Sequence, residues 1–371
     1  MSQASFNPEA PNVIRRTLES ERFDRVMAAM ERRVPDRVPW ALWGHFPACR
    51  WLNGYSWEKS SRDGEESAKA HMALLRELDY AMDLLKVTPY YRFMAMQWGS
   101  RFRFEDNDEE APTVEVAVKK ADDWGRLWVL DPKKELREFV RCNEILARDL
   151  RRMPFIYTIP SPIIQAMNGV SEPDQVLKDM KENPDALRQG LGTITETTID
   201  FAKACVDAGA SGIFLGVGGG GRIWSELTKP QLEEYALGYD RRVLDAVDCP
   251  IKLMHICSTP EGNPRKLFEE GWFKKYPVTA VNWAAHSWTP VKQGKRLYGD
   301  RFCVVGGLDH EKTLRTGTPR QVEEQVRTAI EDAGEGGGFI VGPGCTVFQD
   351  MPFENYNAVG RAVMKHGVYR R

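Results

Sequence analysis

The stretch Pro250-Ile251-Lys252-Leu253-Met254-His255-Ile256-Cys257-Ser258 decides how the rest of this chain is interpreted. Its first half is largely apolar and is typical of a buried β-strand. His255 and Cys257 are two residues apart, so on an extended backbone their side chains point to the same face. A nitrogen and a sulfur on one face at the end of a strand would hold a soft metal ion such as zinc. The alternative for both residues is a place in the core, because free cysteine is among the most buried residue types.

A candidate for the third metal ligand lies far along the chain. Cys345, in Gly342-Pro343-Gly344-Cys345-Thr346, follows a second strand-like run at 338–341. One histidine and two cysteines would leave the fourth position of zinc open, which is typical of a catalytic site rather than a structural one. This prediction requires a fold that brings the ends of the two strands together.

Alternation of strands and helices predicts such a fold. Eight strand-like runs alternate with segments of helical pattern, and the strands are expected at 38–43, 82–87, 155–159, 212–215, 250–256, 278–283, 302–306 and 338–341. This order predicts an α/β protein whose residues 1–371 form a single (β/α)8 TIM barrel, with a doubly wound open sheet as the alternative. A helix at 20–33 would be an N-terminal helical extension, preceded by a loose arm at 1–16, and 101–118 would be a β-hairpin insertion.

Composition excludes several classes of function. The chain has 371 residues, of which 42% are hydrophobic, and a net charge of -2, so there is no broad basic surface for nucleic acid. Its seven cysteines have no close regular spacing and suit a reducing compartment rather than a disulfide framework. No apolar run approaches the roughly 20 residues of a membrane span. We therefore expect a cytoplasmic protein.

A barrel places the C-terminal ends of all its strands on one face, where such enzymes carry their chemistry. Asp83 on the second strand and Asp309 and His310 after the seventh are candidate catalytic residues, and His286 after the sixth is a candidate substrate contact. Asp83 could instead be a structural hydrogen-bond acceptor, Asp309 a helix cap and His286 an ordinary loop residue.

Two further groups of residues are expected at the same face. An aromatic, charge-poor substrate pocket is predicted from residues near the first two strands, namely Trp43, His45, Phe46, Tyr90 and Tyr91. The glycine run 216–221 follows the fourth strand, and backbone without side chains permits close approach of a large cofactor at Gly218, Gly219 and Gly220. The run is no phosphate-binding loop of the Walker type, because no Gly-Lys-Ser/Thr follows it.

From about residue 20 to its end, the chain resembles the uroporphyrinogen decarboxylase superfamily. The residues that carry the resemblance are Arg33-Val34-Pro35-Asp36-Arg37-Val38-Pro39, Met82-Asp83, Gly306-Gly307-Leu308-Asp309, Gly317-Thr318-Pro319-Arg320-Gln321-Val322 and Gly337-Gly338-Phe339-Ile340. Two departures separate it from the decarboxylase itself. The motif that carries paired arginines for the porphyrin carboxylates reads Trp43-Gly44-His45-Phe46-Pro47-Ala48-Cys49-Arg50 here, with only Arg50 left, and Cys345 replaces a histidine of the last motif.

The pattern His255-x-Cys257 with a distant Cys345 is similar to the zinc signature of the corrinoid-dependent methyltransferases of this superfamily. The resemblance implies zinc, a corrinoid (cobalamin) on a separate partner protein, and methyl transfer between that corrinoid and a small methylated compound or thiol. The aromatic pocket favours a methoxylated aromatic as the methyl donor. The alternatives are a metal-independent decarboxylase-like lyase and a non-catalytic tetrapyrrole carrier. The sequence leaves the oligomeric state open, with a homodimer among the choices.

Overall fold

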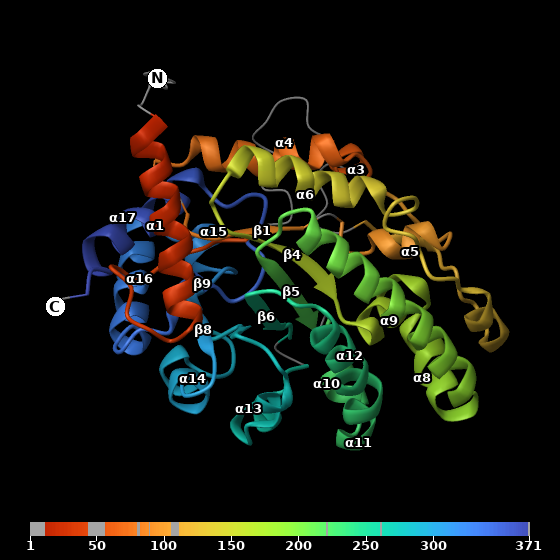
Figure 1. Ribbon diagram of the computed structural model, residues 1–371. Coiled ribbons are helices and arrows are strands. Elements are labelled where there is room, and N and C mark those ends of the chain that lie inside the picture. Colours follow the sequence, from red (N-terminus) through yellow and green to blue (C-terminus); the bar gives the residue numbers. More distant parts are fainter. Residues whose placement is uncertain are drawn as a thin grey trace.

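The computed structural model describes residues 12–43, 56–79, 82–88, 90–104, 111–219, 222–259 and 262–369; for residues 12–20 and 77 only the backbone is described. Seven parallel strands form one curled sheet in the order β1-β4-β5-β6-β7-β8-β9. The strands are β1 (Leu85–Val87), β4 (Phe155–Pro160), β5 (Gly212–Val217), β6 (Ile251–Ile256), β7 (Ala280–Trp283), β8 (Cys303–Leu308) and β9 (Phe339–Pro343). Helices surround the sheet (Figure 1), which confirms the predicted TIM-barrel-like α/β fold.

The extended segment 38–43 lies between the two edge strands of this sheet. It pairs with β9 through a parallel bridge between Trp40 and Val341, where the Ala41 amide donates to the Val341 carbonyl at 3.0 Å. Towards β1, the Asp83 amide donates to the Trp40 carbonyl at 3.0 Å. The segment 38–43 was predicted as the first regular strand. It is irregular because the Trp40 amide donates to the Asp83 carboxylate and not to the backbone of a neighbouring strand. The second predicted strand is also shorter than expected, because β1 begins at Leu85 and not at Met82.

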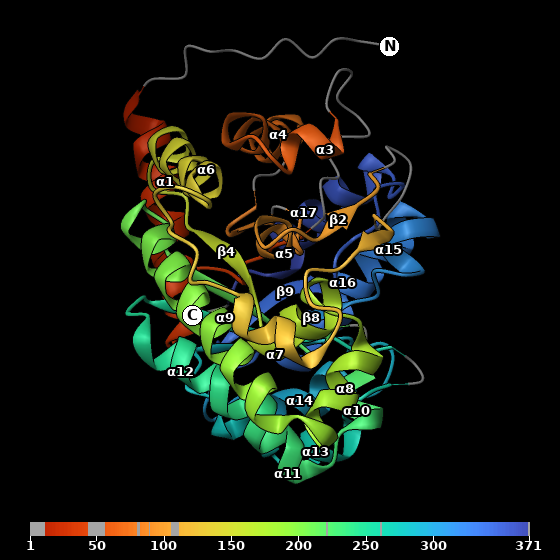
Figure 2. The same ribbon diagram turned by 90° about the vertical axis from the view of Figure 1, so that its right-hand side faces the viewer.

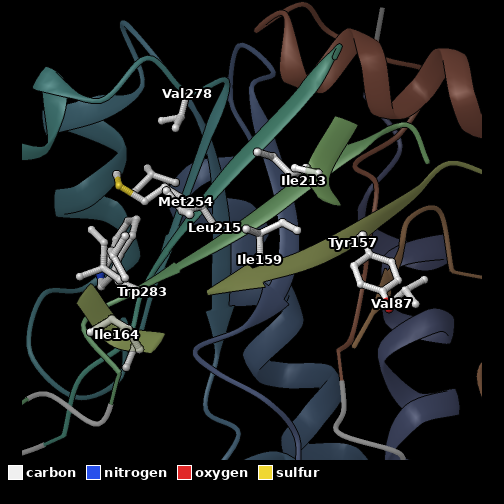
Figure 3. Packing of buried hydrophobic residues seen from close by; sticks show 14 of the residues in the cluster. Val87, Tyr157, Ile159, Ile164, Ile213, Leu215, Met254, Val278 and Trp283 are labelled. Carbon is white, nitrogen blue, oxygen red and sulfur yellow. The ribbon is translucent and has the colours of Figure 1, made fainter. Parts of the chain in front are cut away.

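Two layers of apolar side chains follow from the alternation of residues along the strands. One layer lies inside the barrel and includes Leu84, Ile156, Phe214 and Leu253. The other lies between the strands and the surrounding helices, and Figure 3 shows part of it, including Tyr157, Ile159, Ile213, Leu215 and Met254. Both layers are required because each strand of a barrel is covered on its two faces.

The helix α1 (Asn12–Met30) packs its buried side chains Val26, Ala29 and Met30 against the inner layer, beside the first residues of β6, β7 and β8. It therefore covers the N-terminal end of the barrel, and the C-terminal ends of the strands remain for a functional site. The helix begins at Asn12, within the stretch 1–16 that was predicted as a loose arm; residues 1–11 lie outside the described part of the chain.

The remaining helices lie outside the sheet, and α4 and α6 run side by side at one end of the molecule (Figures 1 and 2). Their bounds are α3 (Trp57–Ser60), α4 (Gly64–Glu77), α5 (Phe93–Gln97), α6 (Arg137–Leu150), α7 (Pro162–Gln165), α8 (Pro173–Glu182), α9 (Pro184–Asp207), α10 (Arg222–Glu226), α11 (Lys229–Gln231), α12 (Gly238–Ala246), α13 (Arg265–Glu269), α14 (Val291–Tyr298), α15 (Thr313–Thr316), α16 (Pro319–Ala333) and α17 (Phe353–His366). The predicted insertion at 101–118 contains an antiparallel pair, β2 (Arg101–Phe102) and β3 (Thr113–Glu115). Among the described residues, no helix has both the length and the apolar character needed to cross a membrane.

Candidate metal centre

Three side chains predicted as metal ligands meet at the C-terminal end of the barrel. His255 lies near the end of β6, Cys257 directly follows that strand, and Cys345 follows β9. One nitrogen or sulfur atom from each lies within 4.8 Å of the other two, and the Cys345 Sγ is 3.4 Å from the His255 Nε2. The curled sheet therefore brings together residues that the sequence separates by most of its last third.

The distances fit a tetrahedral zinc ion. With bonds of about 2.3 Å to sulfur and about 2.0–2.1 Å to nitrogen, two ligand atoms of a tetrahedron lie about 3.5 Å apart. The observed 3.4 Å between the Cys345 Sγ and the His255 Nε2 agrees with that separation. One nitrogen and two sulfurs are also ligand types that zinc prefers, and they leave one position for a substrate.

Asn282 on β7 sets the orientation of the histidine. The Asn282 amide nitrogen donates to the Val305 carbonyl at 2.9 Å and to the Pro343 carbonyl at 3.0 Å, so its Oδ1 must be the atom that faces His255. This Oδ1 lies 2.6 Å from the His255 Nδ1, which therefore carries the ring proton. The Nε2 is the ring nitrogen that faces Cys345, at 3.4 Å from its Sγ.

Neighbouring side chains favour the thiolate form of Cys345. A hydrogen bond from the Cys257 thiol, together with the adjacent His255 ring, holds the pKa of Cys345 well below its usual value, although burial of the group opposes this. Because the thiolate and not the thiol binds metal, the cluster favours the ligating form of this residue.

The glycine run after β5 supports the backbone of Cys257. Gly218 has a φ of +96°, and a Cβ there would lie 2.3 Å from the Cys257 carbonyl oxygen. The same oxygen accepts a hydrogen bond of 2.8 Å from the Trp224 Nε1. A Cβ on Gly219 would lie 2.4 Å from Ile164. The close approach predicted for these glycines is thus made by the protein itself; binding of a cofactor at Gly218 or Gly219 stays a prediction, and Gly220 lies outside the described residues.

Open space adjoins the metal ligands on β5. Gly216 pairs in register with His255, and a Cβ on Gly216 would meet no described atom within 4 Å. The next inward residue, Phe214, stacks on the His255 imidazole with ring centres 5.3 Å apart. The space beside His255 is therefore bordered on β5 by a residue without a side chain.

A second group of polar side chains lies beside the first. His286, Asp309 and His310 each place one potential ligand atom within 4.8 Å of the others. The His286 Nε2 lies 3.5 Å from the Asp309 Oδ1 and 3.3 Å from the Glu311 Oε2. Burial lowers the pKa of His310 below its usual value. Gly344 joins the two groups, because a Cβ on it would lie 2.9 Å from the His286 ring.

The carboxylate of Asp309 also has a structural contact. Its Oδ1 accepts hydrogen bonds from the amides of Glu311 at 2.9 Å and Lys312 at 3.0 Å, in the turn before α15. The contact stabilises the turn, whereas the N-cap residue of α15 is Lys312; the capping role considered as the alternative for Asp309 is therefore not found. The catalytic role of Asp309, and that of His310, stay predictions.

Asp83 lies at the opposite end of β1 from the metal ligands. Its buried carboxylate accepts from the Arg25 Nη1 at 2.8 Å, from the Arg37 Nη1 at 2.7 Å and from the Trp40 amide at 3.0 Å. These contacts join α1 and the segment 38–43 to β1. The structure therefore favours the structural alternative for Asp83 over the predicted catalytic role.

The residues predicted to form an aromatic pocket divide between two places. Trp43 is buried inside the barrel, with its ring centre 5.5 Å from that of Phe214. Tyr90 is buried among Trp57, Phe102 and Phe104, and its hydroxyl donates to the Ala111 carbonyl. Its neighbour Tyr91 lines a small cavity with Pro160 at the end of β4. His45 and Phe46 lie outside the described residues.

Two polar residues near the proposed metal ligands were not predicted as site residues. Asn282 and Lys86 each interrupt an apolar strand, and this interruption at an inward-facing position is the signal that identifies them. Lys86 on β1 is buried, and loss of water around its ammonium lowers its pKa to about 8, although the thiols of Cys345 and Cys257 oppose this shift.

Comparisons with known proteins give the family and the fold. The family model of uroporphyrinogen decarboxylase matches residues 21–366. The uroporphyrinogen decarboxylase of Enterobacter sp. (strain 638) is 25% identical over 93% of this chain and 97% of its own length, and that of Alkalilimnicola ehrlichii is 26% identical over 92% and 93%. Among solved structures, a methyltransferase from Methanosarcina mazei has a TM-score of 0.76 at 19% identity, covering 93% of this chain and 98% of its own.

Proposed function

The chain belongs to the uroporphyrinogen decarboxylase family, and we propose that within this family it is a zinc-dependent methyltransferase. It would move a methyl group between a small methylated compound, such as a methoxylated aromatic, or a thiol, and a corrinoid held by a separate protein. The observation that supports the proposal is the convergence of His255, Cys257 and Cys345, whose ligand atoms all lie within 4.8 Å of one another. The shared fold with the methyltransferase from Methanosarcina mazei supports the same class of reaction.

Zinc in this position would act as a Lewis acid on an ether oxygen, or bind a thiol and lower its pKa. Three residues of the chain would orient the zinc ligands and leave space beside them. Asn282 fixes the proton of His255 on Nδ1, and Trp224 holds the Cys257 carbonyl, so both ligands are oriented before a substrate arrives. Gly216 leaves room for the substrate beside them.

His286 is placed to handle the proton of the reaction. Its Nε2 lies 3.5 Å from the Asp309 carboxylate and 3.3 Å from that of Glu311, and its ring lies against Gly344, next to Cys345. It would give a proton to the oxygen or sulfur released by demethylation and take one from an incoming thiol.

Metal analysis and a methyl-transfer assay test the proposal together. We expect about one zinc per chain, and demethylation of a methoxylated aromatic, a methylamine or a methylated thiol by reduced cobalamin, followed through the cobalt absorption spectrum. The variants Cys257→Ser and Cys345→Ser should lose both zinc and activity. Cys249→Ser is the matched control, because Cys249 is likewise a half-buried free thiol but lies before β6, at the other end of that strand.

The relatives with curated names favour a second candidate, a metal-independent lyase of the decarboxylase type. That function requires cationic groups for the acidic side chains of a porphyrin. Retention of full activity by a zinc-free protein, or decarboxylation of a porphyrinogen by both serine variants, would replace the methyltransferase proposal with this one.

A further inference from the structure

Lys86 lies inside the barrel, close to the proposed metal ligands. Its side chain projects from the middle of β1, and the residue is only 3% exposed. The Lys86 Nζ lies 4.6 Å from the centre of the Phe214 ring, and this ring stacks on the His255 imidazole at 5.3 Å. At most about 10 Å therefore separates the ammonium from the centre of the imidazole.

No carboxylate pairs with the Lys86 ammonium in the described part of the chain, and the acidic groups that act on it are the thiols of Cys345 and Cys257. No hydrogen bond or ion pair of the Lys86 ammonium is found among the described residues. The side chains next to it on the same face of β1 and β4 are the apolar Leu84 and Ile156, together with Thr88 and Thr158, whose hydroxyls bond to each other at 2.8 Å. Lysine is almost never this buried without a partner, because removal of its ammonium from water is costly. A buried cation of this kind indicates a binding site for an anion.

The charges of the proposed metal ligands determine whether the metal centre could balance Lys86. With zinc bound, Cys257 and Cys345 would coordinate as thiolates and supply two negative charges. These balance a divalent zinc ion, so the metal centre would be neutral and would not compensate Lys86. A ligand with one negative charge would then balance the Lys86 ammonium.

We propose that Lys86 is a substrate-binding residue that balances the charge of a monoanionic aryl oxide or thiolate bound at the metal centre. This rests on the proposed function, in which such an anion is the demethylated partner of the reaction. When the methyl–oxygen or methyl–sulfur bond breaks, its electron pair stays on the heteroatom, which becomes anionic, and the methyl group passes to the reduced corrinoid. Lys86 binds the product more strongly than the methyl ether and stabilises the charge as it develops.

Binding of matched ligands tests this without turnover. Calorimetric titration of the zinc-loaded protein with pentafluorophenolate and with its methyl ether, pentafluoroanisole, compares two molecules of similar shape that differ by one charge. The same pair in sulfur is thiophenolate and thioanisole, and it distinguishes the two kinds of anion. We expect the wild type to bind at least one of the two anions about 10-fold or more tightly than its ether.

The variants identify the source of that preference. Lys86→Met should bring the ratio of anion to ether affinity close to one with little change for the ether, and Lys86→Arg should retain the preference. Lys252→Met is the control, because Lys252 lies on β6 but its Nζ donates to the Leu244 carbonyl outside the barrel. Circular dichroism and zinc content check that each variant is folded and loaded.

The results of this binding test can be distinguished from those of the methyl-transfer assay. A wild type that prefers neither anion, or a folded Lys86→Met protein that keeps the preference, overturns the role of Lys86 even if methyl transfer is observed. A preference that depends on Lys86 in a protein that transfers no methyl group supports the anion site and counts against the reaction.

Discussion

The Oδ1 of Asn282 lies 2.6 Å from the Nδ1 of His255, and this contact decides which ring nitrogen faces the two cysteines. We predict that Asn282→Ala weakens zinc binding by about 10- to 100-fold, because the imidazole loses the partner that fixes its proton. Competition with a chromogenic chelator measures the affinity. Asn143→Ala is the control, since Asn143 is also a buried asparagine but lies on α6; equal zinc affinities for the two variants would contradict the assignment.

Gly218 and Gly216 are expected to respond in opposite ways to an added methyl group. Gly218→Ala should lower zinc affinity and stability, because φ is +96° and the new Cβ would lie 2.3 Å from the Cys257 carbonyl. Gly216→Ala should fold and bind zinc normally, since its Cβ enters open space. Thermal unfolding with and without a chelator separates the two effects. A Gly218→Ala protein with unchanged zinc affinity would show that the loop does not position Cys257.

Asp83 is expected to matter for stability and not for metal binding. Asp83→Asn should destabilise the protein by about 3–5 kcal/mol, because Arg25 and Arg37 would lose their shared buried counter-charge. Asp36→Asn, at a carboxylate that is 59% exposed, should cost less than about 1 kcal/mol. Urea unfolding measures both values. Loss of zinc from the folded Asp83→Asn protein would instead favour a role at the site.

Asp240 is expected to make stability depend on pH. Its buried carboxyl, bonded to the Tyr276 hydroxyl at 3.1 Å, has a pKa raised by burial to about 7, against about 3.9 in an unfolded chain. Below pH 4 the group is neutral in both states; between pH 4 and 7 the unfolded state alone ionises, so stability falls as pH rises, by about 4 kcal/mol at most.

Asp240→Asn should remove this dependence. The variant is expected to be more stable than the wild type at pH 8 and similar to it near pH 4, as measured by urea unfolding across this range. Asp185→Asn, at a carboxylate that is 97% exposed, serves as control and should follow the wild type. Parallel curves for Asp240→Asn and the wild type would exclude Asp240 as the source.

The sequence predicted the barrel and the convergence of the three proposed metal ligands because both leave local signals. Inward and outward residues alternate along each strand, and His255, Cys257 and Cys345 lie at strand ends that a parallel barrel must bring together. The contacts that orient those ligands leave weaker signals. Asn282 and Trp224 act through single hydrogen bonds whose partners depend on the three-dimensional packing of neighbouring strands and loops.

Residue type alone could not decide between the catalytic and the structural role of Asp83. An acidic residue on a barrel strand suits a catalytic role or an ion pair equally well, and its position along the strand decides between them. Because the regular part of β1 begins only at Leu85, Asp83 lies at the end of the barrel covered by α1. The two arginines that bind it come from segments whose packing could not be read from periodicity.

The pairing of Trp40 with Val341 gives the polypeptide a particular order of assembly. The segment that completes the ring, 38–43, is synthesised long before its partner strand, β9. Until then, the edges of β1 and of the strands made so far stay unpaired and open to association with other chains. Closure of the ring must therefore wait until β9 has been synthesised, and pairing of segments so distant in sequence is slow.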